Sequence, residues 1–331
     1  MSVTPIKPAA GPAITSHPHL HAPAPAPAHD DAGRARVALP ALRLLFLTAG
    51  ALYASWGVEI PAVKAHFGLG EQALSWALLA GGLGTTGAIA CAAPALARWG
   101  ERRVAVLCGV VMAAALGAVL MVKSYAALLA LMVLFGVVAG LFDVAINAQA
   151  SELERRQGRP LMSGLHAWFS LGGLLGAGVG AGLLKLGLSP AHHLLCVGAA
   201  GALAVLPGAA RMLAHRPAPA PADTGKARPR GALLLLGLLA ASGLVAEGAM
   251  YDWSVLLLAQ ARGANPVQAA LAFASFSAAM AAGRFGGDAL RARWPMVTLL
   301  RACGLLAAAG MALTLAPGPL WAALAGCALV G

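Results

Sequence analysis

Apolar runs of membrane-spanning length recur along the chain and are separated by short polar segments. A helix with a rise of about 1.5 Å per residue needs about 20 such residues to cross a hydrocarbon core of about 30 Å. The pattern predicts nine membrane-spanning α-helices. They cover residues 40–60, 73–95, 104–122, 126–150, 161–185, 191–213, 232–258, 267–289 and 296–316. A tenth run begins near Leu320 and reaches the chain end at Gly331, so we expect only part of a span there.

Two polar segments divide the chain. Residues 1–38 are rich in Pro and Ala, and no apolar stretch of signal-peptide type precedes Leu39, so we expect a disordered cytoplasmic tail. Residues 215–231, HRPAPAPADTGKARPRG, have no apolar face to bury and are typical of a cytoplasmic linker. We therefore expect a first helical bundle over 39–214 and a second over 232–331.

Composition and charge agree with a membrane protein. The residues are 60% hydrophobic and 11% charged, whereas soluble domains carry about 25% charged residues. The net charge of +11 does not indicate a nucleic-acid partner, because the positive residues lie in short clusters between apolar runs. Eighteen of them fall in one set of alternate polar segments and four in the other. Because Lys and Arg are retained in cytoplasmic loops, this bias predicts an inner or plasma membrane protein with a cytoplasmic N-terminus.

A repeat with a shift of 195 residues indicates two bundles. The sequence Ala-Arg-Trp at 97–99 recurs at 292–294, and Cys-Gly at 108–109 recurs at 303–304. Six predicted helices lie within one shift, which is typical of transporters built from two parallel six-helix halves. A full copy of the first bundle would extend beyond about residue 400. We therefore expect a fragment of about nine and a half spans, with the second bundle incomplete.

Several segments resemble the major facilitator superfamily. The turn ARWGERR at 97–103 is similar to the superfamily's loop motif, although Ala97 stands where an aspartate is usual, and GRFGGDALRARW at 283–294 is a second copy. The segments DVAINAQASELER (143–155), SGLHAWFSLGGLLGAGVG (163–180) and AEGAMYDW (246–253) resemble the MosC/YbjJ-like branch. The resemblance implies two six-helix bundles, alternating access, and a cavity lined by spans one, four, seven and ten. It assigns cytoplasmic loop roles to Arg98, Gly100, Arg102, Arg103, Arg284 and Arg293.

Glycines recur in the fifth span at positions that suit helix packing. Gly172, Gly176 and Gly180 are similar to a glycine motif of exporters, although Ala177 stands at its proline position. Independently of the resemblance, glycines four residues apart offer a face on which two helices can approach closely. We expect these three residues to pack helices rather than bind a ligand.

Ionisable residues inside the spans are the main candidates for chemistry, because a charge in hydrocarbon costs at least about 2.5 kcal/mol. Asp143 and Asn147 are one turn apart in the fourth span, and His166 in the fifth span lies at a similar depth. We expect Asp143 and His166 to form a pair that holds or passes a proton, with Asn147 binding a polar ligand. The alternative is a structural hydrogen bond between the two helices.

Further candidates lie nearer the outer side. Glu247 and Asp252 in the seventh span and Glu59 in the first are expected to form an outer gate or a second proton station, although Asp252 and Glu59 could instead contact headgroup water. Trp56, Trp168, Tyr251 and Trp253 could stack on a sugar ring or a cation, the commoner role of such residues being interfacial anchoring.

The function predicted from the sequence is secondary active transport. We expect an all-α polytopic protein that moves a small polar or amphipathic solute by alternating access with proton coupling. The alternatives are a drug or metabolite exporter of the same fold, or a transporter-derived sensor or scaffold that binds without flux. No G-x-S-x-G or H-E-x-x-H motif is present, so we expect no enzyme, and we expect no cofactor or metal. The expected partners are the solute, protons and membrane lipid, and the expected state is a monomer.

Overall fold

The computed structural model of the chain describes residues 29–213 and 231–331, and this part is helical throughout, without strands. Its ten helices are α1 (His29–His66), α2 (Glu71–Trp99), α3 (Glu101–Ala118), α4 (Tyr125–Gln157), α5 (Met162–Lys185), α6 (Pro190–Ala210), α7 (Gly231–Ala261), α8 (Pro266–Arg293), α9 (Met296–Leu315) and α10 (Leu320–Val330). The predicted all-α class is therefore confirmed. Every apolar run forms a helix.

Eight of these helices are long and apolar enough to cross a membrane, as judged by length and composition. The other two are α3 and α10, of 18 and 11 residues. The predicted third span at 104–122 ends early as a helix, at Ala118, because a short turn follows and Ser124 caps α4 by accepting a hydrogen bond from the Ala127 N–H at 3.2 Å. Three charged residues at its start, Glu101, Arg102 and Arg103, reduce the apolar length of α3 further.

The boundary of the N-terminal tail differs from the prediction. The tail was expected to run to residue 38, but α1 begins at His29. The added residues HDDAGRARVA are mostly compatible with a helix, and extending an existing helix is far easier than nucleating one. Residues 1–28 and 214–230 lie outside the described residues, and the second range contains the predicted linker except for Gly231.

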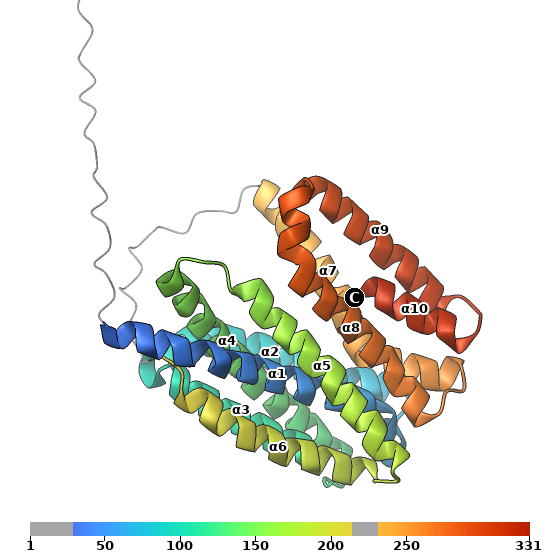
Figure 1. Cartoon of the computed structure of the whole chain (residues 1–331). Helices are drawn as coiled ribbons and strands as arrows, with labels where there is room; N and C mark the ends of the chain where they lie inside the picture. The colour runs from blue at the N-terminus through green and yellow to red at the C-terminus, as the bar shows by residue number, and fades with distance from the viewer. Residues whose placement is uncertain (1–28, 214–230) are drawn as a thin grey trace, which may run out of the picture.

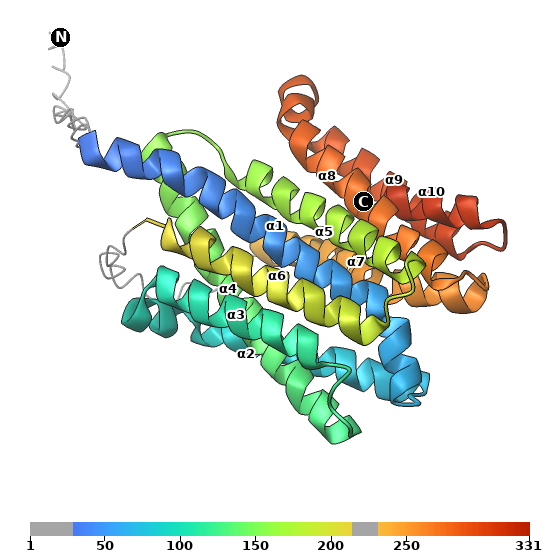
Figure 2. The same cartoon turned by 60° about the horizontal axis from the view of Figure 1, so that its bottom comes forward.

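Helices α1 to α6 form one bundle with α1 inside it. α1 packs against α5 and α6, α2 packs against α4, and α3 lies between α4 and α6 (Figures 1 and 2). The core is apolar, with Phe46 and Phe142 fully buried. At the crossing of α1 and α5, a Cβ on Gly172 would lie 2.0 Å from the Leu47 carbonyl oxygen. Only glycine permits backbones to approach so closely.

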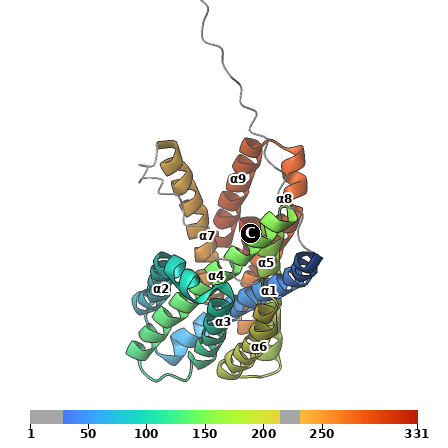
Figure 3. The same ribbon diagram turned by 90° about the vertical axis from the view of Figure 1, so that its left-hand side faces the viewer.

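Helices α7 to α10 lie beside this bundle, and α8 runs along α5 (Figure 1). Phe273 and Phe276 of α8 are buried. Gly57 of α1 lies where a Cβ would be 2.7 Å from the Phe273 ring and 2.9 Å from the Tyr251 carbonyl oxygen. In contrast, the first half of α7 is exposed and is not covered by any described helix, as Figure 3 shows.

The two ends of the structure differ in charge and in contacts. We call the end at which α1 begins the basic end, because six arginines lie in or beside the α2–α3 and α4–α5 turns there. The other end is called the opposite end. At the opposite end, Gln260 at the end of α7 donates a hydrogen bond of 3.2 Å to Glu71 at the start of α2, and Lys64 of α1 forms an ion pair with Glu71. The hydrogen bond between Gln260 and Glu71 joins the two groups of helices at the opposite end, while the Lys64 ion pair holds Glu71 within the first bundle.

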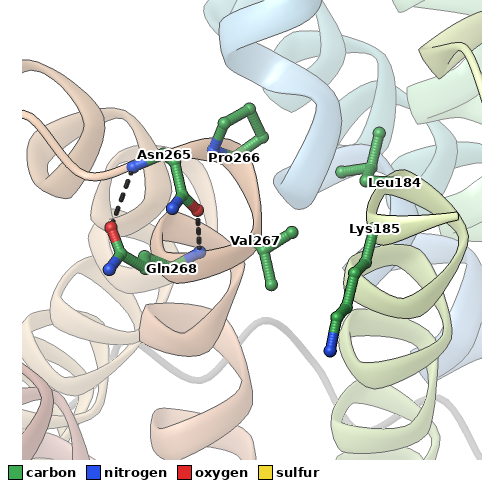
Figure 4. A pocket seen from close by; sticks show the side chains of 6 residues that line it. All are labelled: Leu184, Lys185, Asn265, Pro266, Val267 and Gln268. Carbon is green, nitrogen blue, oxygen red and sulfur yellow. Dashed lines mark hydrogen bonds between the residues drawn. The ribbon is translucent and has the colours of Figure 1, made fainter. Parts of the chain in front are cut away.

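A wide hollow of about 460 Å³ also lies at the opposite end, between the last turn of α5 and the first turn of α8 (Figure 4). On its α8 side, the Asn265 and Gln268 side chains each accept a hydrogen bond from the other residue's backbone N–H, which forms a capping box. Lys185 is the one charged residue that lines the hollow. We do not place the functional site here, because no acid or aromatic side chain lines the hollow.

Candidate functional site

Three polar side chains of the first bundle form a connected row on α4 and α5. The Asn147 amide donates to the Asp143 carboxylate at 3.0 Å, and its oxygen lies 3.2 Å from Nε2 of His166. The predicted direct pair between Asp143 and His166 is therefore replaced by a bridge through Asn147. One helical turn separates Asp143 from Asn147, so the amide fills the position that histidine was expected to occupy. Asp143 is exposed although it lies well inside α4.

A second polar cluster is centred on Arg284 of α8. Its guanidinium donates to the Glu247 carboxylate of α7 at 3.1 Å, to the Ser170 hydroxyl at 2.7 Å, and to the His166 carbonyl oxygen at 3.3 Å. Tyr251 donates to the same Glu247 oxygen at 3.2 Å. Arginine suits this position because its fork of donors can satisfy several acceptors at once.

The two clusters meet on α5. His166 presents its ring to Asn147 and its carbonyl oxygen to Arg284, so a continuous polar network runs from Asp143 through α5 to Glu247. Glu247 and Arg284 have side chains 24% and 26% exposed, which leaves the ion pair partly shielded from water. A charge pair in such surroundings is stable only while both partners remain, because either ion alone has lost much of its hydration.

Arg284 was expected in a cytoplasmic loop, and this expectation is wrong. The residue lies within the apolar part of α8, with nine residues of the helix still to follow. Its charge is tolerated there because Glu247 compensates it. The basic sequence around it made Arg284 look like part of the loop, and sequence spacing gives no sign of a partner 37 residues away.

The other loop-motif residues lie at the basic end. Gly100 separates α2 from α3 with φ of +77°, and its N–H bonds to the Leu96 carbonyl oxygen at 2.8 Å. Its positive φ explains why glycine is needed between these two helices. Arg98 lies in the last turn of α2, and Arg102 and Arg103 lie in the first turn of α3. Arg293 is the last residue of α8.

Glu59 is buried inside the first bundle, so the contact with headgroup water that was one alternative for it is absent. It is 2% exposed and its carboxylate lies 2.7 Å from Nδ1 of His193 in α6, which is fully buried. His193 was not singled out from the sequence, and its partner Glu59 is 134 residues away along the chain. The nearby Gly180 makes room for the ring, since a Cβ there would lie 2.8 Å from it.

Asp252 lies on α7 beyond Glu247 and lines a small cavity together with Tyr53 and Trp56 of α1. Tyr53 was not singled out from the sequence. No hydrogen bond or ion pair joins Asp252 to another residue in the described part of the chain. The expected association of Asp252 with Glu59 is therefore absent there.

The remaining aromatic candidates lie in different places. Tyr251 packs against Phe273 and Phe276 with ring centroids 5.2 Å apart in each case. Trp168 lies under the Arg43 guanidinium, 5.8 Å from the ring centroid. Trp253 lines a separate cavity between α7 and α9. Trp56 lines the cavity that also contains Asp252.

The network can hold protons and bind a polar ligand, but it does not resemble a metal site. Among the described residues, no group of three or more His, Cys, Asp or Glu side chains could hold a metal ion. The two carboxylates and the histidine can instead gain or lose protons. The neutral amide of Asn147 can donate and accept hydrogen bonds.

Comparison with known proteins identifies the family. The model of the Major Facilitator Superfamily matches residues 44–331. An uncharacterized MFS-type transporter of Yersinia pestis is 34% identical over 290 residues, which are 87% of this chain and 75% of that protein. Membrane protein MosC of Rhizobium meliloti is 27% identical over 308 residues, 92% of this chain and 74% of that protein.

Solved structures share the fold at low identity. A mutant of the nucleoside transporter NupG has a TM-score of 0.64 and 12% identity, covering 88% of this chain and 78% of that one. A bacterial homolog of the human lysosomal transporter Spinster, inward-facing and unoccupied, has a TM-score of 0.61 and 18% identity, covering 90% and 74%. With its apolar helices and this family match, the chain is an integral membrane protein that belongs to the major facilitator superfamily of transporters.

Proposed function

We propose that the protein is a secondary active transporter that moves a small polar or amphipathic solute across the cell membrane by alternating access, coupled to protons. The observation that carries this proposal is the polar network that joins α4 and α5 of one bundle to α7 and α8 of the other. Charges at membrane depth are costly, and a network of them at the junction of two moving units is suited to coupling.

Glu247 is the proposed proton-coupling residue. While ionised, it attracts the Arg284 guanidinium, which also binds the hydroxyl of Ser170 on α5. When a proton binds the Glu247 carboxylate, the charge attraction to Arg284 ends, although Ser170 and the His166 carbonyl oxygen remain as acceptors. This loss weakens the contact of α7 with α8 and, through Arg284, with α5. It therefore favours a different arrangement of the two bundles.

Asp143 is the proposed second station. Its described partner is the neutral amide of Asn147, so ionised Asp143 carries an uncompensated negative charge. A proton or a positively charged solute group could neutralise it, and Asn147 and His166 could then hydrogen-bond a polar solute. The basic end would face the cytoplasm, in line with the distribution of arginines.

The test is solute-induced proton movement in vesicles that contain the protein, followed with a trapped pH-sensitive dye. The panel comprises sugars, polyols and organic cations, each compared in wild type and in Asp143→Asn and Glu247→Gln variants. We expect at least one solute to move protons in the wild type, and both substitutions to reduce this movement by at least about tenfold, since each removes a carboxylate to which the proposal assigns proton binding.

Glu152→Gln is the matched control. The Glu152 side chain is 23% exposed and pairs with Arg156 at 2.6 Å and with Arg155 near the basic end of α4, away from the network of Asp143 and Glu247. The control is expected to behave as wild type. Undiminished proton movement in both Asp143→Asn and Glu247→Gln, with normal insertion, would contradict the proposed coupling.

A further inference from the structure

A small cavity lies in the interface between the two groups of helices. It lies nearer to the opposite end than the Arg284 cluster does. Its volume is about 170 Å³. Asp252 follows Glu247 by five residues on α7, a rise of about 7.5 Å. The lining residues come from α1, α2, α4 and α7 and include Tyr53, Trp56, Gly82, Thr85, Phe135 and Asp252.

Asp252 is the one acid among the residues that line this cavity, and no Lys, Arg or His joins it there. The Thr85 hydroxyl is already bound to the Gly81 and Gly136 carbonyl oxygens, at 3.2 and 3.1 Å. The Asp252 carboxylate thus has no partner in the described part of the chain. An ionised carboxylate withdrawn from water requires a positive partner, so the cavity is complementary to a cation.

The walls of the cavity are aromatic. The Phe135 ring lies 5.9 Å from the Tyr53 ring at an interplanar angle of 75°, and 6.3 Å from the Trp56 ring at 38°. All three residues line the cavity, so aromatic surface surrounds part of one small volume. A cation within about 6 Å of a ring centroid is attracted to the π face, and the attraction grows when water is excluded.

The shape of the cavity limits the size of the occupant. At about 170 Å³ it is smaller than sites for drug-sized molecules, which usually occupy about 300–1,000 Å³. The close crossing of α2 and α4 fixes its floor, since a Cβ on Gly136 would lie 1.9 Å from the Gly81 carbonyl oxygen. The cavity therefore suits a small cation or the charged head of a longer solute.

We propose that this cavity binds an organic ammonium group, with Asp252 as its counter-ion and Tyr53, Trp56 and Phe135 as its aromatic walls. The inference rests on the proposed transport function and gives its solute a chemical class, that of amines and alkylated ammonium compounds. Asp252 binds the positive group, and the rings exclude water and favour a cation over a neutral group of the same shape.

The test is ligand binding to the purified protein, which needs no transport. Choline is the probe, and its uncharged carbon analogue dimethylbutanol is the matched ligand of similar shape. Binding is followed by the midpoint of thermal unfolding and by tryptophan fluorescence at neutral pH. We expect choline to raise the midpoint and change the fluorescence, and dimethylbutanol to do neither at the same concentration.

Two variants assign the site. Asp252→Asn is expected to weaken choline binding by at least about tenfold, and Trp56→Leu by about threefold to tenfold. Their controls are Glu152→Gln, which removes an acid near the basic end of α4 and outside the cavity, and Trp76→Leu, which removes a 56% exposed tryptophan. Both controls are expected to bind choline as wild type does. If Asp252→Asn unfolds, Trp56→Leu against Trp76→Leu still provides the comparison.

Three results would overturn the proposal. Equal binding of choline and dimethylbutanol would show an apolar site without charge recognition. Choline binding that survives both Asp252→Asn and Trp56→Leu would place the cation elsewhere. Absence of choline binding in the wild type would show that Asp252 and the rings do not form an ammonium site. None of these results would affect proton movement through Asp143 and Glu247, so a failure here is distinguishable from a failure of the transport proposal.

Discussion

Glu59 and His193 form the most completely buried polar pair that the structure describes, with side chains 2% and 0% exposed. Nδ1 of the histidine faces the acid, while Nε2 has no hydrogen-bond partner in the described part. A fully buried pair loses its hydration on both sides, so each member depends on the other. The pair therefore acts within the first bundle, between α1 and α6.

Replacing His193 should destabilise the protein strongly. His193→Ala leaves the Glu59 carboxylate buried without a partner, and breaking such a pair costs about 3–5 kcal/mol. The neighbouring His192 is exposed and bonded only to Ser189, so His192→Ala is the matched control. Thermal unfolding of the purified variants should show a large decrease for His193→Ala and little change for His192→Ala. Similar midpoints for the two would contradict the role given to the pair.

At the residue scale, the sequence revealed single charged positions more readily than their partners. Asp143 and Glu247 stood out because acids are rare in apolar runs. The link from Glu247 to Arg284 and the link from Glu59 to His193 join residues on different helices. Such pairs depend on how the helices are rotated and placed, which periodicity along one chain does not give.

At the scale of elements, the crossing of α1 and α5 depends on glycine on both helices. A Cβ on Gly50 would lie 1.9 Å from the Phe169 carbonyl oxygen, and a Cβ on Gly172 would lie 2.0 Å from that of Leu47. The atoms in the way are backbone, so they cannot move aside as a flexible side chain could. Dispersion contacts between the two backbones hold the helices together here.

Gly172→Ala should therefore push α1 and α5 apart. We expect a loss of about 1–3 kcal/mol, as for overpacking in a core, measured as a lower midpoint of thermal unfolding. Gly178 is on the same helix and has nothing within 4 Å of its would-be Cβ, so Gly178→Ala is the matched control. The control should be neutral or slightly stabilising, because alanine is the better helix former. Equal losses in both variants would contradict the close crossing.

The positions of the helices were predictable because apolar length follows directly from the thickness of the bilayer. The residues at which the helices begin and end were less predictable. α1 extends back to His29 through residues without an apolar run, and α3 stops at Ala118 although apolar residues continue to Val122. Helix ends depend on capping and on neighbouring turns as much as on hydrophobicity.

At the scale of the whole molecule, the contacts between the two groups of helices differ from end to end. Glu71 and Gln260 join α2 to α7 at the opposite end. At the basic end, α7 residues from Leu233 to Val245 are exposed, and the contact of α5 with α8 through Ser163 and the Arg284 carbonyl oxygen joins the groups on that side. The internal repeat indicated two bundles, but it gave no information on which residues meet between them.

The proposed alternating access requires the hydrogen-bonded contact between Glu71 and Gln260 to open. The measurement uses a variant without native cysteines and with a reporter, Leu78→Cys, in the wall of the cavity that contains Asp252. Cysteines at Glu71 and Gln260 are cross-linked with an oxidant to form a clamp across the interface. The control clamp joins Lys64 and Glu71, which lie at the same end but both within the first bundle.

An impermeant thiol reagent is then applied to either side of oriented membranes, and labelling of the reporter is measured. Alternating access predicts labelling from both sides in the unclamped protein and with the control clamp, but only from the side of the basic end when Glu71 and Gln260 are joined. Labelling from one side alone in the unclamped protein, or from both sides with the interface clamp closed, would contradict the account.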